Sequence, residues 1–150
     1  MQISRSPAPL WTQGHARRRF TPVATESGDR SPAAVFIVED QPIMRETYRL
    51  IFRYMPFLRV CGVAASGEEA LSAFPGASPD LVLVDLSLPG MSGIELVRAI
   101  TRDYPQVRVL VTSGYSDAEH ERESREAGAH AFVPKGDMPA LEAEIKRLIA

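Results

Sequence analysis

The chain has a single cysteine, Cys61, among its 150 residues, and it lacks any long apolar run. One cysteine excludes an intramolecular disulfide framework and a cysteine-rich zinc site. No run approaches the ~18 consecutive apolar residues that a membrane-spanning helix needs. The arginine-containing N-terminus is not followed by an apolar stretch, so no secretory signal is predicted. We therefore expect a cytoplasmic protein with no membrane partner.

An excess of charge of one sign is also lacking, since the formal net charge is −2. This near-neutral total argues against a protein that binds polyanions as a whole, so we expect no direct nucleic-acid binding by its main domain. Apolar residues make up 45% of the chain and charged residues 24%, as in ordinary globular proteins, and the length suits a single domain.

The near-neutral total conceals two segments of opposite charge. Residues 1–33 contain five arginines and two acidic residues, whereas residues 34–150 carry 12 basic and 17 acidic side chains. The first segment is rich in Pro, Ser, Thr and Gly and has no apolar periodicity, so we predict a disordered basic N-terminal extension. Two alternatives stay open. Arg17–Arg19 with Trp11 and Phe20 would suit docking to an acidic or nucleic-acid partner, or the start of the chain is misplaced.

From residue 34 onward, short apolar runs alternate with helical patterns. Five strands alternating with five helices predict an α/β fold with a parallel sheet, right-handed crossovers and helices on both faces, which is a (βα)5 doubly wound architecture. The predicted strands cover residues 34–38, 57–65, 81–84, 107–111 and 129–133. The predicted helices begin after Asp40, Ser66, Ser92, Ser116 and Asp137, and the second to fourth end near Pro75, Asp103 and Ala127.

Several features of these helices are specific enough to be tested. Asp40 is predicted as the N-cap of the first helix, with Pro42 in its first turn. Ser66 and Glu69 form a capping-box pattern at the start of the second helix. The fourth helix, residues 117–127, is almost wholly polar, so it has little to pack with and we expect it to be mobile. The apolar residues of the first helix that fall roughly on one face are Ile43, Tyr48, Ile51, Phe52 and Met55.

Acidic, hydroxyl and ammonium groups stand at the ends of four predicted strands. Taken singly, each has an ordinary reading as a helix cap, a loop acid, a turn residue or a solvated lysine. Together they are harder to dismiss, because functional sites of doubly wound sheets lie at the carboxyl ends of the strands, near a topological switch point. In chain order these residues are Glu39, Asp40, Asp85, Thr112, Ser113 and Lys135.

The chemistry of this set favours a phosphorylation site. Carboxylates about 4 Å apart repel by roughly 4 kcal/mol at an effective dielectric of ~20, so the cluster takes up a proton or a cation, and an all-oxygen site suits Mg²⁺. A carboxylate beside Mg²⁺ can attack a phosphoryl group and form an acyl phosphate. The metal and Lys135 would neutralise the developing charge, and Ser113 would donate a hydrogen bond to the new phosphate. No separate base for activating water is apparent, which disfavours a hydrolase.

Residues 34–150 resemble the receiver domain of two-component response regulators. The stretches that carry the resemblance are, in order, VFIVEDQPIMRE, DLVLVDLSLPGMSGIELV, VLVTSGYSD and GAHAFVPKG. The resemblance covers 117 of the 150 residues and leaves the 33-residue leader outside it. It implies a flavodoxin-like, CheY-like sheet with strand order 2-1-3-4-5.

The resemblance assigns a role to each acidic residue at the edge of the sheet. Asp85 is implied to be the phosphoacceptor. Glu39, Asp40, Asp85 and the backbone carbonyl of Ser87 are implied to hold the Mg²⁺ cofactor. Glu39 stands where an aspartate is more usual, and we expect it still to coordinate the metal.

The resemblance also assigns the residues that bind and sense the phosphate. Ser113 takes the place of the switch hydroxyl, with Gly114 beside it, and Lys135 is the phosphate-binding lysine. Phe132 occupies the aromatic switch position and, because it lacks a tyrosine hydroxyl, would switch by packing alone. The residues implied to shape the loop after the phosphoacceptor are Pro89, Gly90 and Gly93.

The implied function is a phosphorylation-controlled switch. A histidine kinase or a histidine phosphotransfer protein supplies the phosphoryl group to Asp85, and the surface formed by residues 117–150 shifts toward an active state. That surface would bind a downstream protein target, the chain's own output domain if the sequence is cut from a longer regulator, or a second copy in a phosphorylation-dependent homodimer. Such a protein assists its own phosphorylation and dephosphorylation, but it is not an enzyme that turns over an external substrate.

Two other functions are weighed against this one. A haloacid-dehalogenase-like phosphohydrolase needs a second acid two residues after the nucleophile, where this chain has Ser87, and the chain has no insertion long enough to close a substrate pocket. A receiver-like interaction module that is not regulated by phosphorylation is disfavoured by the complete acidic site. The chain ends soon after the last predicted helix, which suits a stand-alone regulator and a fragment equally.

Overall fold

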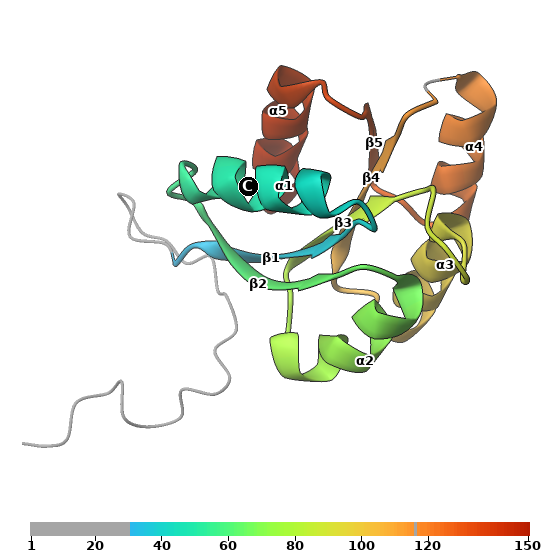
Figure 1. Cartoon of the computed structure of the whole chain (residues 1–150), viewed down its shortest axis with the longest axis horizontal. Coiled ribbons are helices and arrows are strands. Elements are labelled where there is room, and N and C mark those ends of the chain that lie inside the picture. Colours follow the sequence, from blue (N-terminus) through green and yellow to red (C-terminus); the bar gives the residue numbers. More distant parts are fainter. Residues whose placement is uncertain (1–30, 116) are drawn as a thin grey trace, which may run out of the picture. The chain divides into compact units, whose positions relative to one another are not determined.

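The computed structural model describes residues 31–115 and 117–150, in which a parallel sheet carries helices on both faces (Figure 1). The strands are β1 (Ala33–Val38), β2 (Leu58–Ala64), β3 (Leu81–Asp85), β4 (Arg108–Ser113) and β5 (Ala131–Pro134). The helices are α1 (Pro42–Arg53), α2 (Gly67–Ala77), α3 (Gly93–Asp103), α4 (Ala118–Ala127) and α5 (Met138–Ile149). The predictions made for residues 1–30, including the Arg17–Arg19 docking peptide, lie outside the described residues. None of the described helices combines the length and apolar content that crossing a bilayer requires.

The strands pair in the order β2-β1-β3-β4-β5, and all the pairs are parallel, which confirms the predicted (βα)5 architecture and its 2-1-3-4-5 order. β1 and β3 are buried at every position, as expected for strands covered on both faces. The order reverses between these two central strands. Their carboxyl ends therefore open onto the crevice where doubly wound folds bind their ligands.

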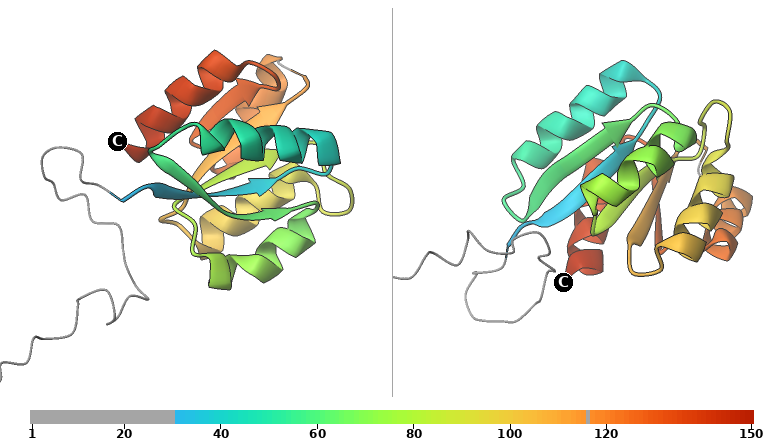
Figure 2. Two further views of the ribbon diagram at one scale, coloured as in Figure 1. Left: turned by 60° about the vertical axis from the view of Figure 1, so that its left-hand side comes forward. Right: turned by 90° about the horizontal axis from the view of Figure 1, so that it is seen from below.

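Each face of the sheet has its own apolar core. α1 and α5 cover one face, and α2, α3 and α4 cover the other (Figure 2). Strand residues alternate between the two, so Ile37, Leu83 and Leu110 pack with α1 and α5. Each fully buried side chain of this size contributes about 1.5–3 kcal/mol. The same alternation places Glu39 and Asp85 on the α1–α5 face, one step beyond the apolar core.

The start of α1 differs from the prediction. Pro42 opens the helix as expected, but the N-cap residue is Gln41 rather than Asp40, and no side chain caps the helix. Ile43 is 80% exposed, so its assignment to the buried face was wrong, whereas Tyr48 and Phe52 are buried. Tyr48 is five positions after Ile43, which places the two residues about 140° apart around the helix axis. The Asp40 carboxylate is therefore free for the sheet-edge site.

The start and end of α2 also differ from the prediction. The helix runs through Pro75 to Ala77 instead of stopping at the proline. Ser66 accepts a hydrogen bond from the Glu69 N–H at 3.2 Å, as the capping-box pattern predicts. The Glu69 carboxylate, however, accepts from the Ala65 N–H rather than from that of Ser66. The reciprocal half of the box is thus displaced by one residue.

The end of the chain follows the predicted pattern more closely. Asp117 caps α4 by accepting a hydrogen bond from the His120 N–H at 2.9 Å, and Gly128 ends the helix with a φ of 121°. α4 packs through two small residues, Ser124 and Ala127, while its other side chains form surface ion pairs. This confirms a largely polar helix, and its mobility stays a prediction. α3 has the predicted bounds, and Asp137 caps α5 as expected.

The close approach of α3 to the loop after β3 can be tested at Gly93. A Cβ atom at Gly93 would lie 2.5 Å from the Leu86 Cα and 2.7 Å from the Asp85 carbonyl oxygen. Because backbone atoms cannot move aside cheaply, Gly93→Ala should lower the free energy of unfolding by about 2–3 kcal/mol in urea titrations. Gly76→Ala in α2 is the control, since its Cβ would meet no atom and the change should be under about 1 kcal/mol. Equal effects of the two substitutions would contradict this packing.

Candidate functional site

Three carboxylates meet at the carboxyl ends of β1 and β3. Glu39 and Asp40 follow β1 and Asp85 ends β3, and one oxygen from each lies within 4.8 Å of the others. Glu39 and Asp85 are each only 1% exposed, and Asp40 is partly exposed. Burying two neighbouring carboxylates carries a large desolvation penalty unless opposite charge and hydrogen bonds compensate it.

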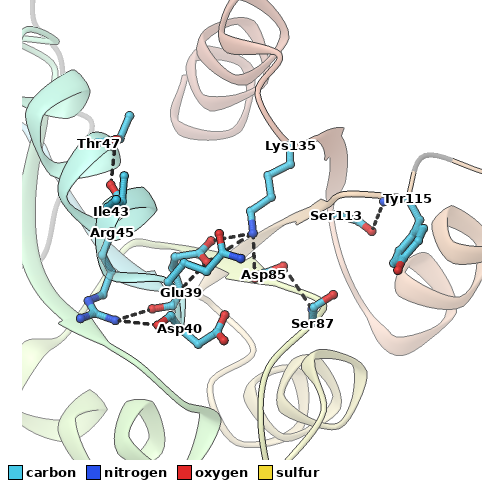
Figure 3. A network of polar contacts seen from close by, with 11 residues as sticks. Glu39, Asp40, Ile43, Arg45, Thr47, Asp85, Ser87, Ser113, Tyr115 and Lys135 are labelled. Atoms are coloured by element: carbon cyan, nitrogen blue, oxygen red, sulfur yellow. Dashed lines mark hydrogen bonds and ion pairs between the residues drawn. The ribbon is translucent and has the colours of Figure 1, made fainter.

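Lys135 supplies the positive charge. Its ammonium Nζ lies 3.0 Å from Asp85 Oδ2 and 3.2 Å from Glu39 Oε1 (Figure 3). The lysine follows β5, and its backbone N–H donates to the Ser113 carbonyl at 2.8 Å, which ties the loop to the end of β4. Among the described residues, one ammonium thus faces three carboxylates. The cluster keeps an excess of negative charge that attracts a cation.

The shifts in pKa follow from this imbalance. Burial raises the pKa of Glu39 above its ordinary value of 4.5, and the Asp85 charge adds to the shift, while the Gln41 N–H and Lys135 offset only part of it. Burial lowers the pKa of Lys135, but its contacts with Asp85 and Glu39 outweigh that effect and the pKa is raised. Lys135 is therefore positively charged at neutral pH. Burial, by contrast, disfavours the ionised form of Glu39.

The donor set fits a hard divalent cation. The Lys135 ammonium donates a hydrogen bond to Glu39 Oε2 at 3.3 Å. The buried Oε1 makes no aligned hydrogen bond within the described part of the chain, so it remains available to a cation. Asp85 Oδ1 accepts a hydrogen bond from the Ser87 N–H at 3.1 Å, which orients the carboxylate. Carboxylate oxygens of this kind are the ligands that Mg²⁺ prefers. The predicted part of the Ser87 carbonyl in binding metal stays a prediction.

The residues predicted to sense the phosphate lie on β4 and β5. Ser113 ends β4 and is 1% exposed, and its Oγ accepts a hydrogen bond from the Tyr115 N–H at 3.0 Å (Figure 3). Its hydroxyl is thus engaged within its own loop, and no hydrogen bond joins it to Asp85 among residues 31–115 and 117–150. Phe132 of β5 is half-buried and packs against the core on the α2–α4 face. Their switching roles stay predictions.

Arg45 is a site residue that the sequence analysis missed. Its Nη1 donates to the backbone carbonyls of Glu39 at 2.9 Å and Asp40 at 3.3 Å, so α1 holds the backbone of the acidic pair in place. A signal was present in the sequence. Arg45 falls in the first turns of a helix, where a positive charge opposes the helix dipole and indicates a partner elsewhere.

The comparison with known families identifies the same part of the chain. The family model described as response regulator receiver domain matches residues 35–146. A two-component response regulator of the LuxR family from Aurantimonas sp. SI85-9A1 has a similar structure, with a TM-score of 0.73 and 34% identity, covering 79% of this chain and 86% of that one.

Two curated relatives are similar in sequence. Protein-glutamate methylesterase/protein-glutamine glutaminase 1 of Syntrophus aciditrophicus is 40% identical over 114 residues, which are 75% of this chain and 33% of the relative. The uncharacterised transcriptional regulatory protein YhcZ of Bacillus subtilis is 36% identical over 105 residues, 70% of this chain and 49% of the relative. The chain thus spans between a third and a half of the length of these relatives.

The energetic cost of the excess negative charge in the acidic cluster can be tested with the substitution Glu39→Gln in metal-free protein. Because the folded-state pKa of Glu39 is raised above 4.5, ionising this carboxyl as the pH rises through that pKa destabilises the wild-type fold. The amide removes this cost, so the variant should be more stable by roughly 1 kcal/mol at neutral pH in urea titrations. The difference should shrink as the pH falls through the raised pKa of Glu39. A variant less stable than the wild type at neutral pH would contradict the electrostatic account.

Proposed function

The chain belongs to the response regulator receiver domain family, and we propose that it is a phosphorylation-controlled switch with Asp85 as the phosphoacceptor. One observation carries the proposal. The Asp85 carboxylate lies at the centre of the site, 3.0 Å from the Lys135 ammonium and beside Glu39 and Asp40. A nucleophilic carboxylate, a cation-binding pair and an ammonium are the groups that acyl phosphate formation requires.

The transfer step follows from the orientation of Asp85. One carboxylate oxygen attacks the phosphorus of a phosphohistidine, so that the new O–P bond forms as the N–P bond breaks and the departing imidazole nitrogen takes up a proton. The Ser87 N–H and Lys135 hold the carboxylate on its two sides, at 3.1 Å and 3.0 Å. A bound Mg²⁺, held by Glu39, Asp40, Asp85 and the Ser87 carbonyl, would neutralise charge on the phosphoryl oxygens.

The new phosphate gives the site its output. It adds about −1.5 to −2 charges beside Lys135 and Ser113. In this proposal the Ser113 hydroxyl leaves the Tyr115 N–H and donates to a phosphate oxygen. Because the Ser113 carbonyl also accepts the Lys135 N–H, a movement of Ser113 passes to β5, where Phe132 moves inward. The surface of α4, β5 and α5 then shifts toward an active population.

Partners follow from the same chemistry. A histidine kinase or a histidine phosphotransfer protein in the cytoplasm supplies the phosphoryl group, and the α4-β5-α5 surface contacts a downstream protein, an output domain or a second copy of the chain. A receiver domain fits a non-enzymatic regulator. We propose that this chain assists its own phosphorylation and dephosphorylation without turning over an external substrate.

Acetyl phosphate tests the phosphoacceptor. With Mg²⁺ present, intact-protein mass spectrometry should show one added phosphoryl group on the wild type and none on Asp85→Asn, because the amide is a poor nucleophile. Removing Mg²⁺ with a chelator should also abolish the addition.

Asp103→Asn is the matched control, since Asp103 is an exposed aspartate at the end of α3 and should not affect labelling. Equal labelling of wild type and Asp85→Asn would disprove the assignment. Continuous release of phosphate by Asp85→Asn would instead indicate hydrolysis that does not pass through Asp85.

A further inference from the structure

Two buried hydroxyl groups lie on the same face of the sheet as the acidic site. Tyr48 on α1 and Thr112 on β4 are each 1% exposed. Thr112 is the register partner of Asp85 across the β3–β4 pair. Asp85 and Thr112 follow Leu83 and Leu110 by one strand period. These two leucines belong to the same core cluster as Tyr48. Tyr48 therefore packs on the sheet face on which Asp85 and Thr112 lie.

The surroundings of the Tyr48 phenol agree with this placement. Burial raises its pKa above the ordinary value of 10.0, the neighbouring Thr112 hydroxyl lowers it in part, and the charges of Glu39, Lys135 and Asp85 also act on it. The phenol is therefore neutral at physiological pH and keeps its proton as a hydrogen-bond donor. No direct hydrogen bond joins it to a carboxylate among the described residues.

The Tyr48 and Thr112 hydroxyls make no aligned hydrogen bond with any described residue. Thr112 is near enough to affect the pKa of Tyr48, but neither the Tyr48 Oη nor the Thr112 Oγ1 meets the distance and angle of a hydrogen bond with any described residue. Both hydroxyls are therefore unsatisfied within residues 31–115 and 117–150. Buried polar atoms are satisfied in the great majority of proteins, and an exception calls for an explanation. A small movement of Thr112 would satisfy both groups.

The proposed switch would move Thr112, because this residue lies at the end of β4. Thr112 directly precedes Ser113, the residue that turns toward the phosphate in the proposed function. The Ser113 carbonyl is tied to Lys135, and the Thr112 carbonyl accepts a hydrogen bond from the Leu86 N–H at 3.0 Å, next to the phosphoacceptor. Rearrangement of Asp85 and Lys135 around a phosphate therefore acts on the end of β4 from both sides.

We propose that Tyr48 and Thr112 are positioning residues for the phosphorylated state. Their hydroxyls form an aligned hydrogen bond when Ser113 turns toward the phosphate, and that bond stabilises the switched position of the end of β4. This inference rests on the proposed function and adds two residues to it. The contact connects α1, which follows the metal-binding pair, with the strand that carries the switch hydroxyl.

Beryllofluoride, a mimic of the phosphoryl group, tests this with Mg²⁺ and the full chain. Tyr48→Phe and Thr112→Val should each weaken beryllofluoride binding about fivefold in calorimetric titrations, because each removes a hydrogen bond made only in the switched state. The double variant should bind no more weakly than either single variant, since both remove the same bond. Affinity for Mg²⁺ alone should stay unchanged in all three.

Two substitutions serve as matched controls. Tyr54→Phe alters an exposed tyrosine at the end of α1, and Thr47→Val removes a hydroxyl that bonds only to the Ile43 carbonyl of the same helix. Both controls should bind beryllofluoride as the wild type does. Thermal unfolding of the metal-free Tyr48→Phe and Thr112→Val proteins should show midpoints equal to or above that of the wild type, because each loses an unsatisfied buried hydroxyl.

The outcomes separate this inference from the proposed function. Lower thermal midpoints with unchanged beryllofluoride affinity would show that the two residues only pack, and additive losses in the double variant would show that they act separately. Either result would overturn the inference while the wild type still bound beryllofluoride. A wild type that fails to bind beryllofluoride with Mg²⁺ would overturn the proposed function and this inference together.

Discussion

The burial of Glu39 and Asp85 beside each other is the constraint on which the site depends. Two buried carboxylates stand at the ends of neighbouring strands with one ammonium, Lys135, between them. The apolar strands force this arrangement, because the reversal of strand order brings the ends of β1 and β3 side by side. The fold thus holds a charge imbalance that a divalent cation would relieve, as the proposed phosphoryl transfer requires.

The rest of the molecule positions and senses this cluster. Arg45 on α1 holds the backbone of the acidic pair, and the link between Ser113 and Lys135 connects β4 to β5. Polar groups that are buried and incompletely satisfied cost stability, and within the described part of the chain they are found on Glu39, Tyr48 and Thr112. That distribution is expected where stability is traded for a change of state.

Much of the site could be predicted from the sequence, because strand-end residues of a parallel sheet must converge. Residue types alone placed Glu39, Asp40, Asp85 and Lys135 at one edge, although the strand order itself came from the family resemblance. Details set by tertiary packing could not be predicted. Ile43 is exposed because only one stripe of α1 meets the sheet, and α2 continues through Pro75 because the proline stands near its end. Contacts such as the hydrogen bond from the Met91 N–H to the Glu68 carboxylate join residues far apart in the chain, and no local pattern signals them.

The central claim is that Asp85 carries the phosphoryl group. Borohydride reduces an acyl phosphate to an alcohol, so it marks the phosphorylated carboxyl permanently. After treatment with acetyl phosphate and Mg²⁺, reduction and proteolysis, peptide mass spectrometry should find homoserine at position 85 alone. Homoserine at position 40, a homologous alcohol at position 39, or an unmodified peptide around Asp85 would contradict the account.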